Sequence, residues 1–281
     1  MEIEFINVVY SLRRSTPLQK RVLDNISFKL NPGLIYGFLG NSCSGKTLIA
    51  ELISLLCKPD SGEILIDNKK IDFKKIKDIN SIRSQIGYVH ENPKEMFLTN
   101  NVKKELEFGM KYYNYKTNSI EKRVIDALKL VNLEEEILDL SLEELSLAEQ
   151  KKVALASILV YNPKVLILDE PTLGLSEKDK KELIRMIRFL KNKFSKTIII
   201  LTKDTDFLYK VANYNYVIHN GEIVEEGQDL ILTNKSMLNK YDLYYPKCLK
   251  FVDLAKKKND ADLEYYKEVK DLIKGVYRDV F

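Results

Sequence analysis

The chain has 281 residues, of which 45% are hydrophobic and 31% charged, with 11 Gly and 7 Pro. This composition is typical of a globular protein and argues against a disordered or fibrous one. A chain of this length buries a full core, and we expect one large domain with a small appendage. The net charge of +4 is too small to indicate nucleic-acid binding. The three cysteines form no CxxC pair, which argues against a disulfide framework and a zinc site.

The chain lacks the sequence signals of membrane insertion and export. Its longest apolar runs, such as Val165–Leu168 and Ile198–Leu201, are far shorter than the roughly 20 residues that span a bilayer. The first residues contain no basic segment followed by a long apolar stretch. We therefore expect neither a transmembrane helix nor a signal peptide.

Short apolar segments in the first third of the chain predict strands separated by turns. The predicted strands are Ile3–Phe5, Ile26–Leu30, Leu34–Leu39, Glu63–Asp67 and Ile86–Val89. A glycine-rich turn follows the strand that ends at Leu39. We expect a helix over Lys46–Leu56 directly after this turn.

The second half of the chain alternates helix and strand signals. Helical spacing dominates residues 101–161, and the two strongest buried-strand signals follow at Lys164–Leu168 and Thr197–Leu201. Between them, Glu177–Lys193 has apolar positions at helical spacing. The order strand, helix, strand predicts a parallel sheet with right-handed crossovers.

Two further elements are predicted near the C-terminus. Asn220-Gly221, between Tyr216–Ile218 and Glu222–Val224, is a strong signal for a β-hairpin. A final amphipathic helix is predicted from a stripe of apolar residues, namely Leu263, Tyr266, Val269, Ile273, Val276 and Val280.

The most specific motif is G-x-x-x-x-G-K-[ST], which lies between a predicted buried strand and a predicted helix. It consists of Gly40, Asn41, Ser42, Cys43, Ser44, Gly45, Lys46 and Thr47. In such a loop, backbone N–H groups turn toward phosphate oxygens, and the helix N-terminus favours negative charge. Lys46 supplies a cation to the terminal phosphates, and Thr47 offers a hydroxyl to Mg²⁺. The motif therefore predicts a nucleoside triphosphate site.

Two carboxylates stand at the end of a predicted buried strand, where ligands of open α/β sheets bind. These are Asp169 and Glu170, which follow Val165–Leu168. A core strand alone explains the apolar run but not the paired acids. We expect Asp169 to hold the water shell of a metal ion and Glu170 to orient or deprotonate an attacking water.

Four further segments complete a pattern: Ile86–Pro93, Leu145–Ala154, Pro171–Ser176 and Leu201–Asp204. Together with the two motifs above, they resemble the Q-loop, signature, D-loop and switch segments of an ATP-binding cassette (ABC) ATPase. With the tail around residues 245–256, the chain closely resembles the ATPase subunits of energy-coupling factor (ECF-type) micronutrient importers. The resemblance covers nearly the whole chain.

The resemblance implies an α/β fold of the P-loop NTPase class, with an ABC-type nucleotide-binding domain. Residues 1–232 are expected to form this domain, including an antiparallel β subdomain and a helical subdomain at about 95–160. Residues 233–281 are expected to form a small C-terminal helical extension. ATP and Mg²⁺ are the implied cofactors.

The chain departs from the family at several functional positions. The Q-loop glutamine is Glu91, the D-loop aspartate is Ser176 and the switch histidine is Lys203. A glutamate still offers an oxygen ligand to Mg²⁺, so Glu91 is expected to act as a metal and catalytic residue. Lys203 has donors and no acceptor, so it can pair with the γ-phosphate but cannot accept a proton. We expect ATP binding to be retained and turnover to be weakened.

The signature segment also differs, because Leu147 and Ala148 replace its two glycines. In the family this segment faces the nucleotide of the partner cassette, so Ser146, Leu147, Ala148 and Glu149 are its expected counterparts here. Side chains at 147 and 148 would crowd that approach, and Glu149 would add negative charge. We hypothesise that the composite site is degenerate. Ser146 and Glu149 also match a helix capping box, which is a purely structural alternative.

Two acidic residues after the Q-loop have two open interpretations. Glu105 and Glu107 either receive a basic coupling helix of a membrane subunit by charge pairing or lie on an exposed helix face.

The resemblance implies the ATP-hydrolysing subunit of an ECF-type importer of a vitamin or metal micronutrient. Its expected partners are a second ABC ATPase subunit, in a heterodimer rather than a homodimer, and integral membrane subunits, with no nucleic acid. The expected location is the cytoplasmic face of the cell membrane. The alternative is a degenerate cassette that binds ATP structurally while a partner cassette hydrolyses it.

Overall fold

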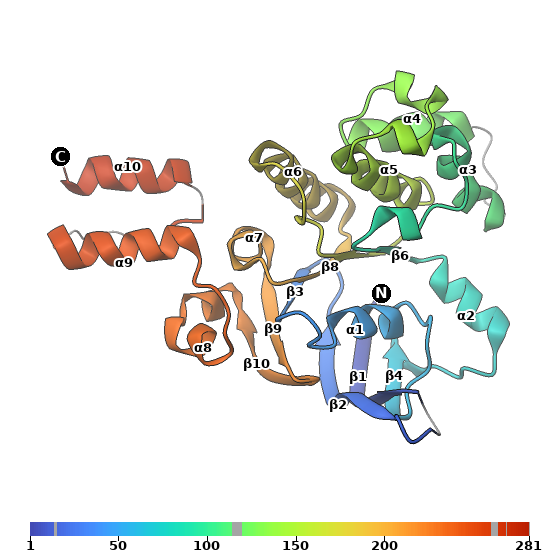
Figure 1. The fold of residues 1–281 in the computed structure, drawn as a ribbon, viewed down its shortest axis with the longest axis horizontal. Helices are drawn as coiled ribbons and strands as arrows, with labels where there is room; N and C mark the ends of the chain where they lie inside the picture. The colour runs from blue at the N-terminus through green and yellow to red at the C-terminus, as the bar shows by residue number, and fades with distance from the viewer. Residues whose placement is uncertain (14–15, 114–119, 260–263, 268, 281) are drawn as a thin grey trace.

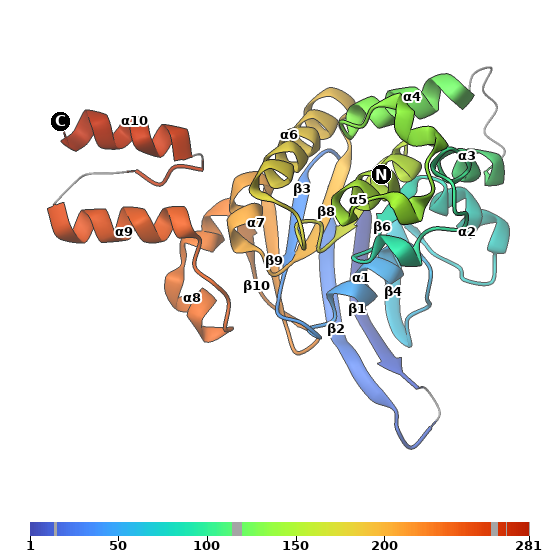
Figure 2. The same ribbon diagram turned by 45° about the horizontal axis from the view of Figure 1, so that its top comes forward.

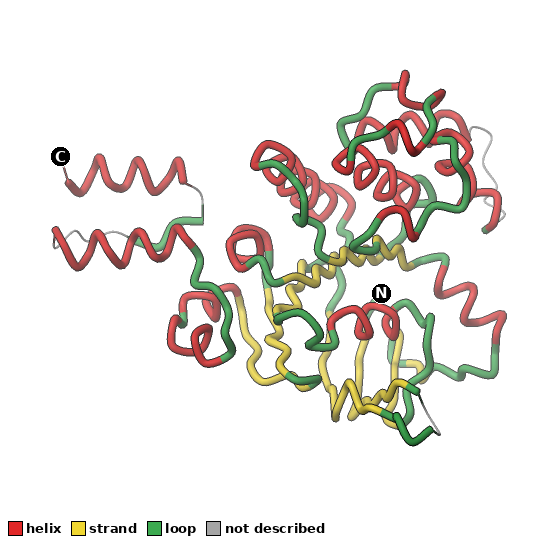
Figure 3. The backbone as a smooth tube through the Cα atoms, viewed as in Figure 1, coloured by secondary structure: helices red, strands yellow, loops and turns green. Residues whose placement is uncertain are grey.

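The computed structural model describes residues 1–13, 16–113, 120–259, 264–267 and 269–280. Its strands form two sheets, and the helices lie around and between them (Figure 1 and Figure 3). The N-terminal sheet is antiparallel, with the strand order β2-β1-β4-β5. Its strands are β1 (Ile3–Leu12), β2 (Lys20–Leu30), β4 (Ser61–Ile66) and β5 (Lys69–Lys70).

Strands β1 and β2 extend well beyond the predicted segments. The pairing of β1 with β2 shifts register between Phe5 and Val8, and Asn7 there has φ +47°. A bulge of this kind interrupts the alternation of inward and outward residues. The period-2 pattern therefore marked only the part of β1 before the bulge.

The second sheet has the strand order β10-β9-β3-β8-β7-β6. Its strands are β3 (Ile35–Leu39), β6 (Ile86–Val89), β7 (Val165–Asp169), β8 (Thr197–Thr202), β9 (Tyr214–His219) and β10 (Glu222–Gln228). Strands β6, β7, β8, β3 and β9 run parallel, and β10 is an antiparallel edge strand. This confirms the predicted parallel sheet. The predicted hairpin is also confirmed, since Asn220 and Gly221 have φ +51° and +81°, as a type I′ turn requires.

The described residues include helices α1 to α10. These are α1 (Lys46–Ile53), α2 (Ile76–Arg83), α3 (Val102–Tyr112), α4 (Ile120–Leu130), α5 (Leu147–Leu159), α6 (Glu177–Phe194), α7 (Thr205–Val211), α8 (Lys235–Lys240), α9 (Lys247–Asn259) and α10 (Val269–Val280). The prediction of a helix over residues 177–193 is confirmed to within one residue. The predicted end of the first helix at Leu56 is wrong. Leu55 has φ +57°, which stops α1 at Ile53.

The core consists of two large apolar clusters, one on each face of the parallel sheet. On one face, Ile49 and Leu52 of α1 belong to the same buried cluster as Phe28 of the antiparallel sheet and Ile199 of β8. Helix α1 therefore lies between the two sheets. The other cluster joins the opposite face of the sheet to α5, α6 and α7 and to the group formed by α3 and α4 (Figure 1). The sheet is thus covered on both faces, as a parallel sheet must be.

Helices α9 and α10 lie side by side and project away from the sheets (Figure 1 and Figure 2). They meet in a small cluster that includes Val252, Tyr266 and Leu272. The predicted stripe is only partly correct, because Tyr266 precedes α10 and Ile273 is 50% exposed. A two-helix hairpin has a single narrow seam, which cannot bury a whole stripe. Leu263 lies outside the described residues.

No helix of the described ranges is both long and apolar enough to cross a membrane.

A buried lysine lies at the edge of the sheet opposite the carboxyl ends of the parallel strands. Lys196, which precedes β8, is 5% exposed. Its ammonium donates a hydrogen bond of 2.7 Å to Asn162 Oδ1 and another to the carbonyl of Pro163. Burial lowers the pKa of Lys196 to about 8.

Candidate nucleotide-binding site

The phosphate loop connects the fully buried strand β3 to α1. Gly45 caps α1 with φ +105°, a conformation that L side chains rarely adopt. A Cβ atom on Gly45 would lie 2.5 Å from Leu23 Cδ2, and one on Gly40 would lie 2.5 Å from the carbonyl oxygen of Ile218. Both glycines are therefore required by backbone geometry and by close packing.

The side chains between the two glycines have different environments. Ser42 and Cys43 are exposed, and Cys43 has φ +62°. Ser44 is 6% exposed, and its hydroxyl has no hydrogen-bond partner among the described residues. The Asn41 amide donates hydrogen bonds of 3.1 and 3.3 Å to the carbonyls of Tyr241 and Asp242. The phosphate loop is therefore tied to the turn that follows α8.

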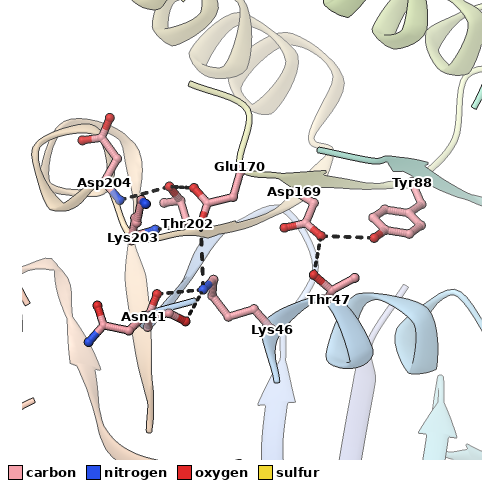
Figure 4. A network of polar contacts seen from close by, with 10 residues as sticks. Asn41, Lys46, Thr47, Tyr88, Asp169, Glu170, Thr202, Lys203 and Asp204 are labelled. Carbon is pink, nitrogen blue, oxygen red and sulfur yellow. Dashed lines mark hydrogen bonds and ion pairs between the residues drawn. The ribbon is translucent and has the colours of Figure 1, made fainter. Parts of the chain in front are cut away.

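Lys46 is buried at the centre of the site (Figure 4). Its ammonium donates hydrogen bonds of 2.7 and 2.9 Å to the carbonyls of Gly40 and Asn41 and lies 3.8 Å from Glu170 Oε1. Burial lowers the pKa of Lys46, and the nearby carboxylates of Glu170 and Asp169 oppose this effect. The ammonium therefore lies within the loop, with a carboxylate on the opposite side.

Asp169 ends β7 and is 3% exposed. Its Oδ2 accepts a 2.9 Å hydrogen bond from the Thr47 hydroxyl and a 3.2 Å hydrogen bond from the Tyr88 hydroxyl. Burial raises the pKa of Asp169, whereas these two hydrogen bonds lower it. Tyr88 was not identified from the sequence. The sequence placed Tyr88 in a predicted strand, but the pairing of that strand with β7 is what brings its hydroxyl to Asp169.

Glu170 follows β7 with φ +40°, which turns its side chain toward β8. Its Oε2 accepts a 2.7 Å hydrogen bond from Thr202, and its Oε1 accepts a 3.2 Å bond from the backbone N–H of Lys203. Burial raises the pKa of Glu170 against the opposing effects of Thr202 and Lys46. A raised pKa brings a carboxylate closer to the range in which it exchanges protons near neutral pH.

The side chains of Glu91 and Lys203 are exposed and extend the charged site. Lys151 of α5 also reaches it and donates a 3.2 Å hydrogen bond to the carbonyl of Glu170. Burial lowers the pKa of Lys151, while Glu91 and Glu170 raise it. The first residues of α5 are thus connected to the end of β7, a contact that the sequence did not predict.

Residues Ser146 to Glu149 of the signature segment lie at the start of α5 and make no hydrogen bond to the network around Lys46 among the described residues. Ser146 and Glu149 form the capping box predicted as a structural alternative. The Ser146 hydroxyl donates a 2.7 Å hydrogen bond to Glu149 Oε2. Leu147 is 46% exposed, and Ala148 is half-buried. Ser176 has a similar structural role, because it caps α6 and accepts a hydrogen bond from the N–H of Asp179.

Neither interpretation of Glu105 is correct. Glu105 is 5% exposed, and its Oε2 accepts hydrogen bonds from the N–H of Leu98, the N–H of Thr99 and the Thr99 hydroxyl, at 2.9 to 3.0 Å. It therefore holds the loop before α3 and is not available to a partner. Glu107 pairs with Lys111 at 2.6 Å on the same helix.

The site fits a nucleoside triphosphate with Mg²⁺. A buried ammonium, the start of a helix and an unpaired buried hydroxyl at Ser44 lie in one loop. Such groups bind phosphate oxygens. Thr47 and Asp169 meet at the edge of this loop and supply oxygen ligands, which Mg²⁺ prefers.

Fold and site together define a P-loop nucleoside triphosphatase. A sequence-family model described as ABC transporter matches residues 23–173, which is more than half of the chain. The chain therefore belongs to the ABC transporter family.

Individual relatives narrow this assignment. The energy-coupling factor transporter ATP-binding protein EcfA2 of Clostridium acetobutylicum is 32% identical over 249 residues, covering 88% of this chain and 87% of the relative. EcfA2 of Streptococcus agalactiae is 34% identical over 253 residues, covering 89% and 90%. The chain is thus an ABC-type ATPase similar to ECF transporter ATP-binding proteins.

Solved structures agree with this assignment. The structure of cbiO1 from Clostridium perfringens, described as part of the ABC transporter complex cbiONQ, has a TM-score of 0.73 at 30% identity and covers 89% of this chain and 98% of that one. The ATP-binding cassette MJ0796, in a dimeric post-hydrolysis state with ADP and Pi, has a TM-score of 0.74 at 25% identity, covering 80% and 98%.

Proposed function

We propose that this chain is the ATP-hydrolysing subunit of an ECF-type importer that takes up a vitamin or metal micronutrient. The observation that carries the proposal is a pair of adjoining contacts, between Lys46 and Glu170 and between Thr47 and Asp169. The curated relatives named energy-coupling factor transporter ATP-binding proteins support it. In this proposal the chain works at the cytoplasmic face of the membrane, with integral membrane subunits and a second cassette as partners.

The positions of the residues support the following roles in this proposal. The loop from Gly40 to Thr47 binds the phosphates, and Lys46 pairs with the terminal ones. Thr47, Asp169 and Glu91 provide oxygen ligands for Mg²⁺, directly or through water. When bound, Mg²⁺ neutralises charge on the phosphates.

Glu170 acts as the general base for the attacking water. Its hydrogen bonds to Thr202 and to the N–H of Lys203 fix its orientation. Lys203 adds a cation for the γ-phosphate but offers no acceptor for a proton. Turnover at this site is therefore slower than with a histidine at the same position.

We further propose the division of the chain into an ATP-binding domain over 1–232, with a helical subdomain at about 95–160, and an extension over 233–281. The signature residues from Ser146 to Glu149 face the nucleotide of the partner cassette. The side chain of Leu147 crowds this approach, which makes one composite site of the pair weak. In a homodimer, both composite sites would contain this altered signature. A heterodimer with a second, different cassette is therefore favoured.

A second candidate function is a cassette that binds ATP structurally while its partner hydrolyses ATP. Two observations favour it: the Ser146 hydroxyl is already bonded to Glu149, and Lys203 replaces a proton-accepting residue. The Glu170 network opposes it.

One experiment separates the two functions. The chain is tagged in its host, and the complex is purified from membranes in mild detergent. Glu170→Gln is compared with Glu63→Gln, a matched change on β4 at a residue that pairs only with Lys70 in the described contacts. We expect Glu170→Gln to lower the ATPase rate of the complex at least about tenfold and the control to leave it unchanged. An unchanged rate in Glu170→Gln favours the structural role, and recovery of the chain without membrane subunits rejects the transporter.

The signature is tested in the same complex. Leu147→Gly combined with Ala148→Gly should raise its ATPase rate, because the segment can then approach the partner's nucleotide. An unchanged rate would mean that the side chains at 147 and 148 do not weaken the composite site by crowding the partner's nucleotide.

A further inference from the structure

Tyr88 reaches from β6 across to the end of the neighbouring strand β7. The two strands are parallel, with Tyr88 opposite Ile167 and Val89 opposite Leu168. The phenol hydroxyl lies 3.2 Å from Asp169 Oδ2. Figure 4 shows the ring on the side of Asp169 that faces away from Lys46. The contact thus joins the strand before Glu91 to the carboxylate assigned to the metal site.

The hydroxyl of Tyr88 is a donor in this contact. The side chain is half-buried, and its pKa is raised, first by burial and then by the charge of Asp169. A phenol carries its proton at neutral pH. An ionised carboxylate can only accept a hydrogen bond.

Two hydroxyl groups donate to the same carboxylate oxygen. Thr47, from α1, lies 2.9 Å from Asp169 Oδ2, and Tyr88 approaches from β6. Among the described residues, the other oxygen, Oδ1, accepts no hydrogen bond. The terminal torsion of an aspartate has broad minima, so its rotation depends on such donors. Together, the two hydroxyls orient Oδ1 away from both of them.

We propose that Tyr88 is a positioning residue that fixes the Asp169 carboxylate for Mg²⁺. The proposal depends on the assignment of Asp169 to the metal site under Proposed function. Thr47 follows the phosphate loop at the start of α1, whereas Tyr88 lies in strand β6 of the sheet. Tyr88 therefore holds Asp169 from an element other than the phosphate loop. Partners of this kind that hold a metal ligand contribute substantially to metal affinity.

A tyrosine at this position is not required by packing alone. Its ring adjoins the apolar cluster under the sheet and contacts the His90 ring edge-on, with 5.8 Å between centroids. A phenylalanine would preserve both contacts. The hydroxyl group is thus the part of the side chain that the proposal concerns.

The test measures ATP affinity by calorimetry in excess Mg²⁺ and in EDTA, using the purified full-length chain. The quantity of interest is the ratio of the Kd in EDTA to the Kd in Mg²⁺. We expect Tyr88→Phe to lower this ratio about tenfold with little change of the Kd in EDTA. Tyr88→Leu, which also lacks the donor, should lower the ratio equally. The control is Tyr216→Phe, which loses a 2.9 Å hydrogen bond to the carbonyl of Lys29 far from the metal site and should keep the ratio.

A double-mutant cycle shows whether Tyr88 acts through Asp169. In an Asp169→Asn background, Tyr88→Phe should cause no further fall of the ratio. The proposal is overturned if Tyr88→Phe keeps the wild-type ratio, or if it lowers the ratio equally in the Asp169→Asn background. A wild-type chain that binds ATP equally with and without Mg²⁺ would instead reject the metal assignment on which the proposal rests.

Discussion

Substitution of the buried Lys196 should change how the stability of the protein depends on pH. The ammonium lies in the interior with two oxygen partners, and burial lowers its pKa from 10.5 to about 8. The cause is the cost of removing a charge from water. Lys196→Met removes the charge and keeps most of the apolar volume.

The sign of the effect follows from the direction of the pKa shift. Below pH 8 the lysine is charged in both states, and folding carries the whole cost of burying the charge. As the pH rises above 8, the folded protein loses this proton before the unfolded chain does, so stability increases with pH. The lowering of the pKa from 10.5 to about 8 corresponds to a loss of about 3 kcal/mol in the free energy of unfolding at neutral pH. About 2 kcal/mol of this loss is regained as the pH rises from roughly 7 to 9.5.

Urea unfolding at several pH values tests this reasoning. The variant also leaves Asn162 Oδ1 and the Pro163 carbonyl without this donor, at a cost of about 1–3 kcal/mol that does not depend on pH. Only the pH dependence of the difference between wild type and variant is therefore informative. The series ends near pH 9.5, because tyrosines with raised pKa, such as Tyr216, reduce stability at higher pH. Parallel curves for the two proteins would refute the argument.

Three further outcomes are expected. Glu105→Ala removes the acceptor of three hydrogen bonds and should destabilise the protein by about 2 kcal/mol or more, whereas Glu107→Ala should cost about 0.5 kcal/mol or less. Equal shifts in thermal unfolding would contradict the buried role of the first residue. Lys203→His should raise the ATPase rate of the assembled complex severalfold while the Kd for ATP stays within about twofold, and an unchanged rate would count against the role assigned to this position. Gly45→Ala, at φ +105°, should weaken ATP binding and lower stability by about 1–3 kcal/mol, and Gly227→Ala, where the added Cβ meets ordinary contacts, should change neither.

Local patterns predicted the parallel sheet and the order of its connecting segments. Strand β6 and helix α6 lie at or within one residue of their predicted bounds, because apolar runs and helical spacing are properties of neighbouring residues. The ends of elements were less predictable. The turn at Leu55 and the bulge at Asn7 depend on backbone dihedral angles to which the apolar pattern is insensitive.

The site was predictable where its residues belong to one motif, and not where it depends on contacts across the fold. The positions of Lys46 and Asp169 follow from the motifs, but the contact between Tyr88 and Asp169 depends on which strand neighbours β7. Glu105 illustrates the same limit. Its position on a helix with charged neighbours suggested exposure, but the loop before α3 folds over its carboxylate.

The hydrogen bonds from Asn41 to the carbonyls of Tyr241 and Asp242 connect the phosphate loop to a segment 200 residues away in sequence. The carbonyl group of the same residue accepts a hydrogen bond from Lys46. A ligand that displaces the Lys46 ammonium therefore acts on Asn41, whose side chain also holds the turn that leads into α9. Linkage is reciprocal. Consider a protein that binds the projecting helices and shifts the turn at residues 241 and 242. The factor by which it changes the affinity of this chain for nucleotide would equal the factor by which nucleotide changes the affinity of this chain for that protein.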